Sequence, residues 1–553
     1  MPAETTTATA DPRPGQATLC WERWCGIGPE VRPAAQSHHL ARFLVLRLLG
    51  LVYFTAFLVF VRQGLPLLGA DGLLPVVDFT ARVTRALGST AAAFERLPSL
   101  FWFGAGDGWM LGAAWAGAAL SLLVVAGLTN AVAMALLWAL YMSFVHVGQD
   151  WYGYGWEIQL LETGFLAVFL APVASLGPFP AERPAPVVVA LLRWLVFRIM
   201  LGAGLIKLRG DACWRDFTCL RYHYETQPLP NPFSRTLHRA PAWVATAGVA
   251  VNHLTEVVAP WLLALGVHAT RVAGCMFVAF QLLLVSSGNL SFLNWLTIVP
   301  ALACFDDAFL SRVLPRRLVA AARAAEARAA ARSSHGTGRL RMVVVTALAG
   351  LVAWLSVPVV RNLASGRQVM NTSFGALDLV NTYGAFGTVG RERRVVTFEG
   401  SDDGRTWKEY ELPCAPGDPA RRPCVVSPYH ERLDWQLWFA AMSTPERYPW
   451  SLHLVWKLLR NDPGTLSLFA VNPFPASPPR YVRARLYTYR FADPASGRWW
   501  TREALGDWIP PLAADDPRLL DFLDAYGWRH DEPARHEEPP RHDEPARPEE
   551  PPR

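Results

Sequence analysis

The sequence predicts a multi-pass α-helical membrane bundle of about nine spans, followed by a β-rich soluble domain. Three observations lead to this fold class. Hydrophobic residues make up 52% of the 553 residues. They gather in runs of membrane-spanning length before residue 361. After that point the apolar runs give way to alternating segments and turn signals, which are typical of strands. A β-sandwich with added helices is one architecture that fits this second part.

The first 39 residues are polar and rich in Thr, Ala and Pro, so we expect residues 1–39 to form a flexible tail. No short apolar segment with a cleavage site stands near the start, so the first span must direct insertion. Residues 40–305 are expected to form an eight-span bundle. The expected spans are 40–61, 109–128, 131–147, 157–172, 187–208, 242–266, 272–289 and 291–305. Span 157–172 is short and carries two glutamates, so we expect it to be tilted or partly re-entrant.

Orientation follows from the basic segment 306–341, which holds eight arginines and one glutamate. Cytoplasmic loops carry an excess of Lys and Arg, so we expect this partly helical linker in the cytoplasm. A ninth span at 342–360 then places everything after residue 360 on the extracytoplasmic side. The loop 208–241 disagrees, because it falls outside although residues 207–239 hold six basic residues. Either this loop folds against the bundle or a span is miscounted.

Residues 361–530 are expected to form the extracytoplasmic β-rich domain. Segment 393–412 predicts two strands around an Asp403-Gly404 turn, which we favour over a calcium loop. Segment 481–491 alternates, and we expect Tyr487 and Tyr489 on an exposed face with two arginines. Residues 433–442 and 450–460 are predicted to be helical. The charged, proline-rich end 531–553 cannot bury a core and is predicted to be disordered.

Ionisable residues inside apolar spans are the first candidates for chemistry, because each is costly in hydrocarbon. They are Glu157, Glu162, Arg193, Arg198, Lys207, His253 and Glu256. His253 and Glu256 lie about 60° apart on one helix face, where Arg198 or Glu162 can meet them. Such a cluster is a proton relay, a metal site or an active site, or else an ion-paired network that fixes helix registry. Two ligands are too few for a metal, so we predict no metal and no cofactor.

The loop 208–241 carries Tyr222-His223-Tyr224-Glu225. His223 can serve as a general base beside Glu225, whereas the alternative is an aromatic loop that packs onto the membrane surface. Trp156 lies in a second aromatic segment, 149–157, which suits the headgroup belt. We therefore carry the loop aromatics, Trp156, and the Arg198 and Glu162 side chains as candidate binding residues.

The eight cysteines form no CxxC or zinc pattern. Cys213 with Cys219, and Cys414 with Cys424, are candidate disulfides, and the predicted topology places both pairs in the oxidising compartment. The chain has three lysines among its 52 basic residues, and no basic run is interleaved with aromatics on a soluble face. We therefore expect the lipid bilayer as a partner and no nucleic acid. The abundance of Arg, Ala, Gly and Pro indicates a GC-rich, bacterial genome.

Several long segments resemble the lipase maturation factor family. They are YGWEIQLLETGFLAVFLAP (154–172), RWLVFRIMLGAGLIKLRGDACWRDFTCLRYHYETQPLPNPFS (193–234), GNLSFLNWLTIVPALACFDD (288–307), NTYGAFG (381–387), VTFEGSDDGRTWKEYELP (396–413), RLDWQLWFAAM (432–442) and NPFPASPPRYVRARLYTYRF (472–491). The bundle is also distantly similar to the transmembrane domain of vitamin K-dependent carboxylases.

The resemblance implies a multi-pass protein that helps secreted lipases fold and assemble. Vertebrate members reside in the endoplasmic reticulum membrane, and a bacterial member would reside in the cytoplasmic membrane. The family is regarded as chaperone-like, so the resemblance supplies no catalytic residues. On this hypothesis the loop 208–241 and the face near Tyr487 and Tyr489 contact a secreted client. The alternative is a membrane enzyme or redox factor acting on lipid or a secreted protein, using His223, Glu225, His253 or Glu256.

Overall fold

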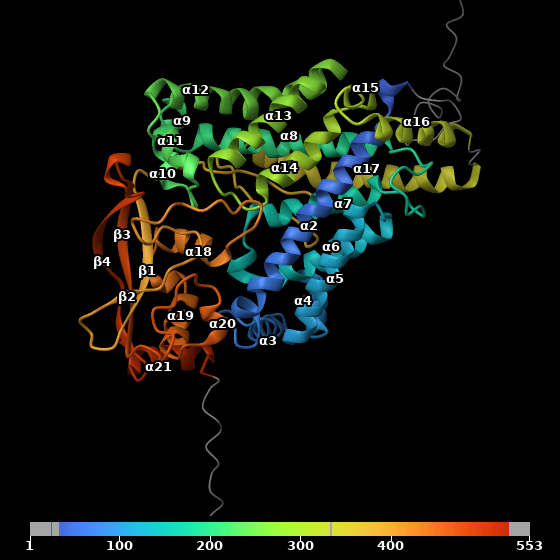
Figure 1. Cartoon of the computed structure of the whole chain (residues 1–553). Helices are drawn as coiled ribbons and strands as arrows, with labels where there is room; N and C mark the ends of the chain where they lie inside the picture. Colours follow the sequence, from blue (N-terminus) through green and yellow to red (C-terminus); the bar gives the residue numbers. More distant parts are fainter. Residues whose placement is uncertain (1–23, 25–32, 332–334, 530–553) are drawn as a thin grey trace, which may run out of the picture.

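The computed structural model describes Trp24 and residues 33–331 and 335–529. Most of the predicted tail 1–39 and all of the predicted disordered end 531–553 lie outside the described residues. The chain forms a helical bundle with a smaller domain, built around a sheet, docked on one end of it (Figure 1). We call this end of the bundle the domain end.

Among the described residues, nine helical segments build the bundle. They are α2 (His39–Leu68), α5 (Asp107–Ala126), α6 (Ala131–Val147), α7 (Gly155–Leu170), α8 (Pro186–Arg209), α12 (Ala242–His253) with η4 (Leu254–Val258) and η5 (Ala259–Ala264), α13 (Val267–Ser287), α14 (Leu293–Ala301) with η6 (Leu302–Cys304), and α17 (His335–Ala364). In the described part of the chain, six of these are long and apolar enough to cross a membrane, and α6 and Leu293–Cys304 are shorter apolar helices. The predicted span 157–172 is the 16-residue α7, which buries Glu157 and Glu162.

Shorter helices join the spans. They are η1 (Ala34–Gln36), α3 (Val76–Leu87), α4 (Thr90–Arg96), η2 (Leu100–Trp102), η3 (Gln149–Tyr152), α9 (Ala212–Arg215), α10 (Leu220–Thr226), α11 (Pro232–His238), α15 (Asp307–Leu310) and α16 (Arg316–Ala331). Within the segment predicted as a linker, 306–341, helices α15 and α16 pack onto α2. Asp307 caps α2 by accepting the backbone N–H of Leu40 at 2.8 Å, and Glu326 accepts from His39 at 3.2 Å.

The C-terminal domain contains one four-stranded antiparallel sheet in the order β2-β1-β3-β4. Its strands are β1 (Arg393–Ser401), β2 (Lys408–Glu409), β3 (Tyr481–Phe491) and β4 (Trp500–Ala513), and its helices are α18 (Arg432–Ala440), η7 (Pro445–Arg447), α19 (Trp450–Leu459), α20 (Pro463–Leu466), η8 (Pro494–Ser496) and α21 (Pro517–Tyr526). The hairpin at Asp403 is confirmed, since β1 pairs with β2. The sandwich is wrong for the described residues, because helices rather than a second sheet cover the inner face.

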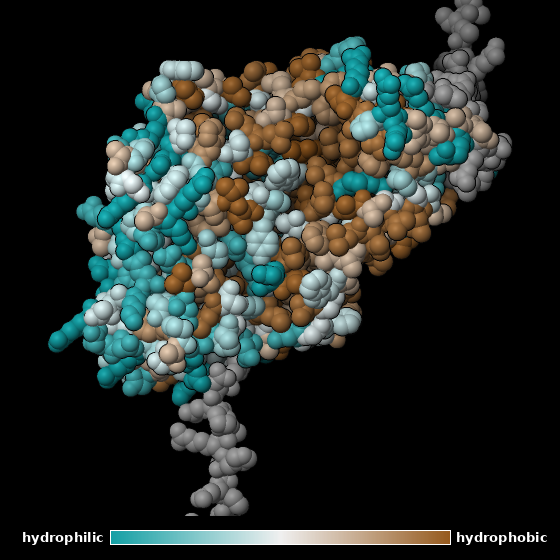
Figure 2. Space-filling model, in the orientation of Figure 1, coloured by the Kyte–Doolittle hydropathy of each residue, from teal (hydrophilic) through white to brown (hydrophobic). Residues whose placement is uncertain are grey.

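One continuous apolar core runs from the bundle into the C-terminal domain, so the two parts are not separated by a linker. Figure 2 shows hydrophobic residues gathered over the bundle and hydrophilic residues over the C-terminal domain. Three contacts join them at the domain end. Gln63 donates to the carbonyl of His430 at 2.8 Å, Asn289 donates to that of Cys424 at 3.0 Å, and Trp151 accepts from Arg432. The chain is therefore a multi-pass membrane protein whose soluble domain rests on one end of the bundle.

Candidate functional site

The loop 208–241 joins the bundle to the C-terminal domain. Arg393, on β1, is buried and donates to three backbone carbonyls of this loop. Its guanidinium reaches the carbonyl of Glu225 at 3.2 Å and that of Pro228 at 2.7 Å, and it also reaches the carbonyl of Gln227. Burial lowers the pKa of Arg393 to about 9. A planar fork of five donors suits such a set of carbonyls.

Glu225 is part of this joint rather than a free carboxylate. Its Oε1 accepts the backbone N–H of Phe491, on β3, at 2.6 Å, and His238 Nε2 lies 3.7 Å from the same oxygen. Trp438 donates its indole N–H to the carbonyl of Thr226 at 2.9 Å. The loop is therefore folded against the rest of the protein, which is one of the two outcomes expected from its excess of positive charge.

The positive charges of the loop are engaged locally. Arg215 donates to the carbonyl of Leu208 at 2.8 Å, and Arg239 lies 3.4 Å from Asp493. Arg235 stacks over the Trp499 ring at 3.7 Å. These contacts hold three of the loop's arginines at the domain end of the bundle. Their position therefore follows from the folding of the loop and not from the rule that basic loops lie in the cytoplasm.

His223 packs in an apolar environment. It is 8% exposed, and its ring meets the Phe386 ring edge-on with centroids 4.8 Å apart. Burial, helped by the charge of Lys207, lowers the pKa of His223 to about 4. The imidazole is therefore neutral at physiological pH. Its neighbour Tyr224 is partly buried with its ring 5.8 Å away, and Tyr222 lies under the guanidinium of Arg391 at 4.2 Å.

His253 and Glu256 face the same part of the bundle, but the predicted partners Arg198 and Glu162 are wrong. Glu256 pairs instead with Lys207 of α8, whose Nζ lies 2.6 and 2.7 Å from its two oxygens. Asn252 completes the group, accepting from Lys207 at 2.9 Å. At this point α12 is followed by the π turn η4, a rare type of helical turn that occurs mostly as a single turn within an α-helix. His253 Nε2 lies 3.0 Å from the carbonyl of Trp214.

Arg198 and Glu162 form a separate buried pair between α8 and α7. This pair holds the NTYGAFG segment, because Glu162 accepts from the Tyr383 hydroxyl at 2.7 Å and Arg198 donates to the carbonyl of Asn381 at 2.8 Å. The segment lies so close to α8 that a Cβ at Gly202 would strike the carbonyl of Tyr383. The ion pairs Lys207–Glu256 and Arg198–Glu162 therefore hold together segments that are far apart in sequence.

Trp156 is buried rather than lying in the headgroup belt. Its ring stacks on Tyr154 with centroids 4.4 Å apart and meets Trp435 of α18 at 4.9 Å. Beneath it, Arg432 pairs with Glu157 at 3.0 Å. The candidate residues omitted Arg393 and Arg432. The only signal for them was that Arg432 begins one of the segments that carry the family resemblance.

The predicted exposure of Tyr487 and Tyr489 is wrong. Tyr489 is fully buried and donates its hydroxyl to the carbonyl of Gly417 at 2.7 Å, while Tyr487 donates to Glu399 at 2.8 Å. The chain covers this outer face of the sheet with the 414–424 segment and Trp500. Val395, Tyr487, Tyr489, Phe491 and Trp500 form a second small core there. Alternation placed the two tyrosines on one face correctly, but it could not show that a distant loop covers that face.

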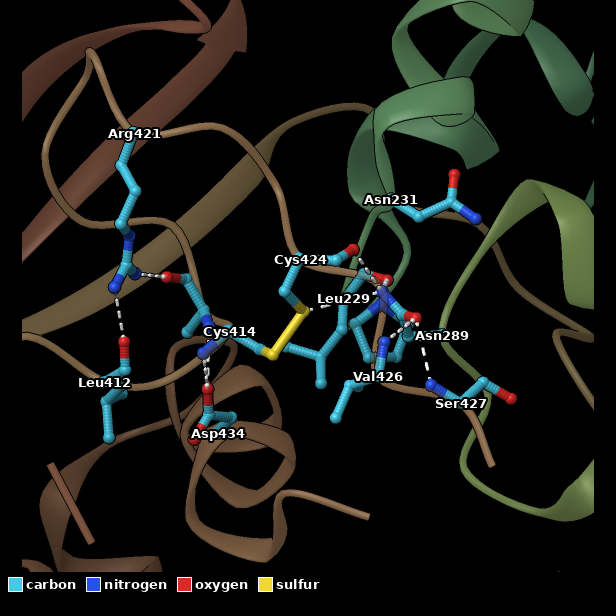
Figure 3. Close-up of a disulfide and its surroundings, with 12 residues drawn as sticks. Leu229, Asn231, Asn289, Leu412, Cys414, Arg421, Cys424, Val426, Ser427 and Asp434 are labelled. Atoms are coloured by element: carbon cyan, nitrogen blue, oxygen red, sulfur yellow. Dashed lines mark hydrogen bonds between the residues drawn. A yellow bond between two sulfur atoms is a disulfide. The ribbon is translucent and has the colours of Figure 1, made fainter. Parts of the chain in front are cut away.

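Both predicted disulfides are present, Cys213–Cys219 with Cα atoms 4.7 Å apart and Cys414–Cys424 with Cα atoms 5.3 Å apart. Figure 3 shows that the second lies against Asn289, whose side chain accepts the N–H of Val426 at 2.9 Å. On the other side Asp434 accepts the N–H of Cys414 at 2.7 Å, and burial raises the pKa of Asp434 to about 6. This disulfide therefore holds the 414–424 segment in place where the C-terminal domain meets the bundle.

Each of the four candidate catalytic residues is engaged by another part of the chain. Glu225 binds the backbone of β3, Glu256 binds Lys207, His253 binds a backbone carbonyl, and His223 packs on Phe386. In the part of the chain that the structure describes, no group of three or more His, Cys, Asp or Glu residues could hold a metal ion. The arrangement is suited to joining and presenting surfaces.

Comparison with known proteins decides the family. Residues 40–312 match the lipase maturation factor transmembrane domain, and residues 379–510 match the lipase maturation factor C-terminal domain. Lipase maturation factor 1 of Bos taurus is 47% identical over 531 residues, which cover 92% of the chain and 94% of that protein. The chain belongs to the lipase maturation factor family.

Other family members are similar along most of their length. Lipase maturation factor 1 of Homo sapiens is 44% identical, covering 91% of the chain and 93% of that protein. Lipase maturation factor 2 of Xenopus laevis is 30% identical, covering 90% of the chain and 86% of that protein. No solved structure matches the chain. A bacterial source and a likeness to vitamin K-dependent carboxylases stay predictions. The residues that join the loop 208–241 to the C-terminal domain all lie within the two matched domains, residues 40–312 and 379–510.

Proposed function

We propose that this protein is a membrane-embedded, chaperone-like factor that assists the folding, maturation or assembly of secreted lipases. Relatives at 44–47% identity carry the name lipase maturation factor 1. On this proposal the protein acts from the extracytoplasmic side, in the endoplasmic reticulum membrane of a eukaryote or the cytoplasmic membrane of a bacterium. It acts by binding rather than by chemistry.

One observation carries this proposal. The loop 208–241 and the C-terminal sheet are joined through the buried Arg393 into a single surface, and the candidate catalytic residue Glu225 is one of the groups that make this joint. A surface built from two parts of the chain is suited to holding a folding protein. One exposed aromatic group on it is Phe233, 45% exposed at the start of α11, beside the stacked Arg235 and Trp499. We propose this group as a client contact, because aromatic and arginine side chains dominate binding interfaces.

The test uses cells that lack their own factor and secrete a lipase. The full-length protein should restore the activity of the secreted lipase, and His223→Ala and His253→Ala should restore it as well. Phe233→Ser should lower the specific activity of the secreted lipase while the amount of membrane protein is unchanged. Leu505→Ser is the control, since Leu505 is 51% exposed on β4, an edge strand of the C-terminal sheet.

Two results would count against the proposal. Unchanged lipase activity with and without the full-length protein would remove the client assignment. Loss of activity with His223→Ala, at normal protein level and normal thermal stability, would instead favour the alternative of a membrane enzyme or redox factor.

A further inference from the structure

The segment between α2 and α5 contains an amphipathic helix, α3. Its Val76, Phe79, Val83 and Leu87 lie along one face, because residues three and four apart share a face of a helix. The start of this face packs on the bundle, since Val76 is buried and Phe79 packs against the core, whereas Leu87 at its end is exposed. Asp78, Arg82 and Arg85 lie on the opposite face. With α4 and η2 this helix forms a short structure that we call the 70–106 hairpin.

The 70–106 hairpin exposes large apolar side chains. Phe103 is 77% exposed, Val77 46%, Leu87 44% and Phe94 40%. The rings of Phe94 and Phe103 lie 5.8 Å apart and form an exposed aromatic pair. A water-exposed surface of this kind is unusual in a soluble protein unless something covers it.

Three contacts fix the position of the 70–106 hairpin along the bundle, at the domain end of α6. Ser99 donates to the carbonyl of Ser143 at 3.0 Å, His146 Nδ1 lies 2.7 Å from the carbonyl of Pro98, and Gln149 donates to the carbonyl of Leu74 at 2.9 Å. The hairpin therefore lies level with the end of a membrane helix. Its helices have 12 and 7 residues, which is too short to cross a bilayer.

The exposed surface of the hairpin continues directly into the lipid-facing side of α5. Trp109, in the first turn of α5, is 55% exposed, and Trp115 and Leu122 further along are 54% and 48% exposed. Trp109 also adjoins the hairpin, since a Cβ added at Gly104 would lie 3.6 Å from its ring. The surface that needs covering is thus an extension of one that the bilayer already covers.

We propose that the 70–106 hairpin is a non-spanning membrane anchor. Its exposed apolar side chains, Val77, Leu87, Phe94 and Phe103, lie at the boundary between headgroups and acyl chains, in the leaflet on the same side as the C-terminal domain. Interfacial amphipathic helices bind in this way, with the apolar face inserted and the charged face toward water. Residues 70–106 hold three acidic and three basic residues, so insertion is driven by apolar burial. The lipid contact therefore does not require anionic headgroups.

The test places a fluorescent label on the full-length protein in nanodiscs. Cys20, Cys25, Cys275 and Cys304 are replaced by Ser, and a polarity-sensitive dye is attached to Phe103→Cys or, separately, to Val77→Cys. Both native positions are exposed, so neither change removes a core contact. Both labels should be quenched by spin-labelled lipids carrying the probe near the headgroup and protected from aqueous iodide. Phosphatidylcholine discs with and without phosphatidylserine should give equal quenching.

Leu505→Cys serves as the matched control and should show the opposite pattern, with strong iodide quenching and none from the lipids. The anchor is overturned if the Phe103→Cys and Val77→Cys labels behave like this control. Iodide protection that appears only when a secreted lipase is added would also overturn it, because the hairpin would then be a protein-binding surface. Quenching that requires phosphatidylserine would contradict insertion by apolar burial.

Discussion

At the scale of single residues, buried charges join parts of the chain that are far apart in sequence. Arg393 is the clearest case, because its guanidinium lies 2.7–3.2 Å from loop carbonyls more than 160 residues away in the chain. Removing one partner of a buried charged hydrogen bond costs about 1.5–3 kcal/mol, and more when carbonyls are left unpaired. Stability at the joint should therefore depend strongly on this one side chain.

We expect Arg393→Met to lower the free energy of unfolding by about 3 kcal/mol, because three loop carbonyls lose their donor. The measurement is thermal unfolding of the full-length protein in detergent. Arg394→Met is the matched control, since Arg394 is the next residue on β1 and is exposed. Equal unfolding temperatures for the two variants would show that the guanidinium does not hold the joint.

His223 should make stability depend on pH. Its pKa is about 4 in the folded protein and about 6.5 when unfolded, so the unfolded chain takes up a proton first as the pH falls. The folded state therefore loses up to about 3 kcal/mol as the pH falls from 6.5 to 4, and keeps the full contribution above pH 6.5.

This prediction is measured as the unfolding temperature from pH 7 to pH 4.5. His223→Gln should weaken the dependence, whereas His268→Gln, at an exposed position, should leave it as in the wild type. Asp434 acts in the opposite direction, because its raised pKa of about 6 removes stability as the pH rises from about 4 to 6. Because the wild type and both histidine variants contain Asp434, comparing their unfolding temperatures cancels its contribution. An unchanged slope in His223→Gln would contradict the assignment.

At the scale of single elements, the 414–424 segment covers a face that would otherwise be open. It is held by Cys414–Cys424, by Asp434 and by Arg421, which donates to the carbonyl of Leu412 at 2.6 Å. A disulfide that closes a loop of this size contributes about 3 kcal/mol. Tyr487 and Tyr489, which lie beneath the segment, are therefore shielded from solvent only while the segment is held in place.

We expect the double change Cys414→Ser/Cys424→Ser to open this segment to trypsin at Arg421. Fragments are followed by mass spectrometry after brief digestion in detergent. Cys275→Ser is the control, because Cys275 is a free cysteine. An unchanged rate of cleavage in the double variant would show that the hydrogen bonds alone hold the segment.

At the scale of the whole molecule, the bundle has two differently built ends. Gln63, Trp151 and Asn289 of the bundle contact the C-terminal domain. At the other end, Arg271 pairs with Asp306 at 2.6 Å and Arg328 donates to the carbonyl of Phe179 at 2.9 Å. Helices α15 and α16 of the arginine-rich segment thus lie at the end of the bundle opposite the soluble domain (Figure 1). The excess of positive charge predicts that this end is cytoplasmic and that the C-terminal domain is extracytoplasmic.

Alkaline phosphatase fusions test this orientation in a bacterial host, since that enzyme becomes active only after export. A fusion after residue 529 should be active, and one after residue 312 inactive. Active fusions at both positions would contradict the predicted orientation, and so would the reverse pattern. Western blots of the fusions control for their amounts.

The sequence by itself determined the features that depend on local pattern. Apolar runs predicted the bundle helices, the Asp403-Gly404 turn predicted the hairpin, and short cysteine spacings predicted both disulfides. These features follow from neighbouring residues, whose periodicity and turn chemistry are visible along the chain. The long segments that resemble the family likewise identified it.

Only the tertiary structure decided which polar groups meet. Glu256 pairs with Lys207 rather than Arg198, and Tyr489 is buried although its strand alternates. Such partners are separated by tens to hundreds of residues, so no local pattern specifies them. A charge buried away from water must nevertheless find a partner, and packing of whole helices and loops decides which one is within reach. That is why residues that looked free for chemistry are the ones that hold this protein together.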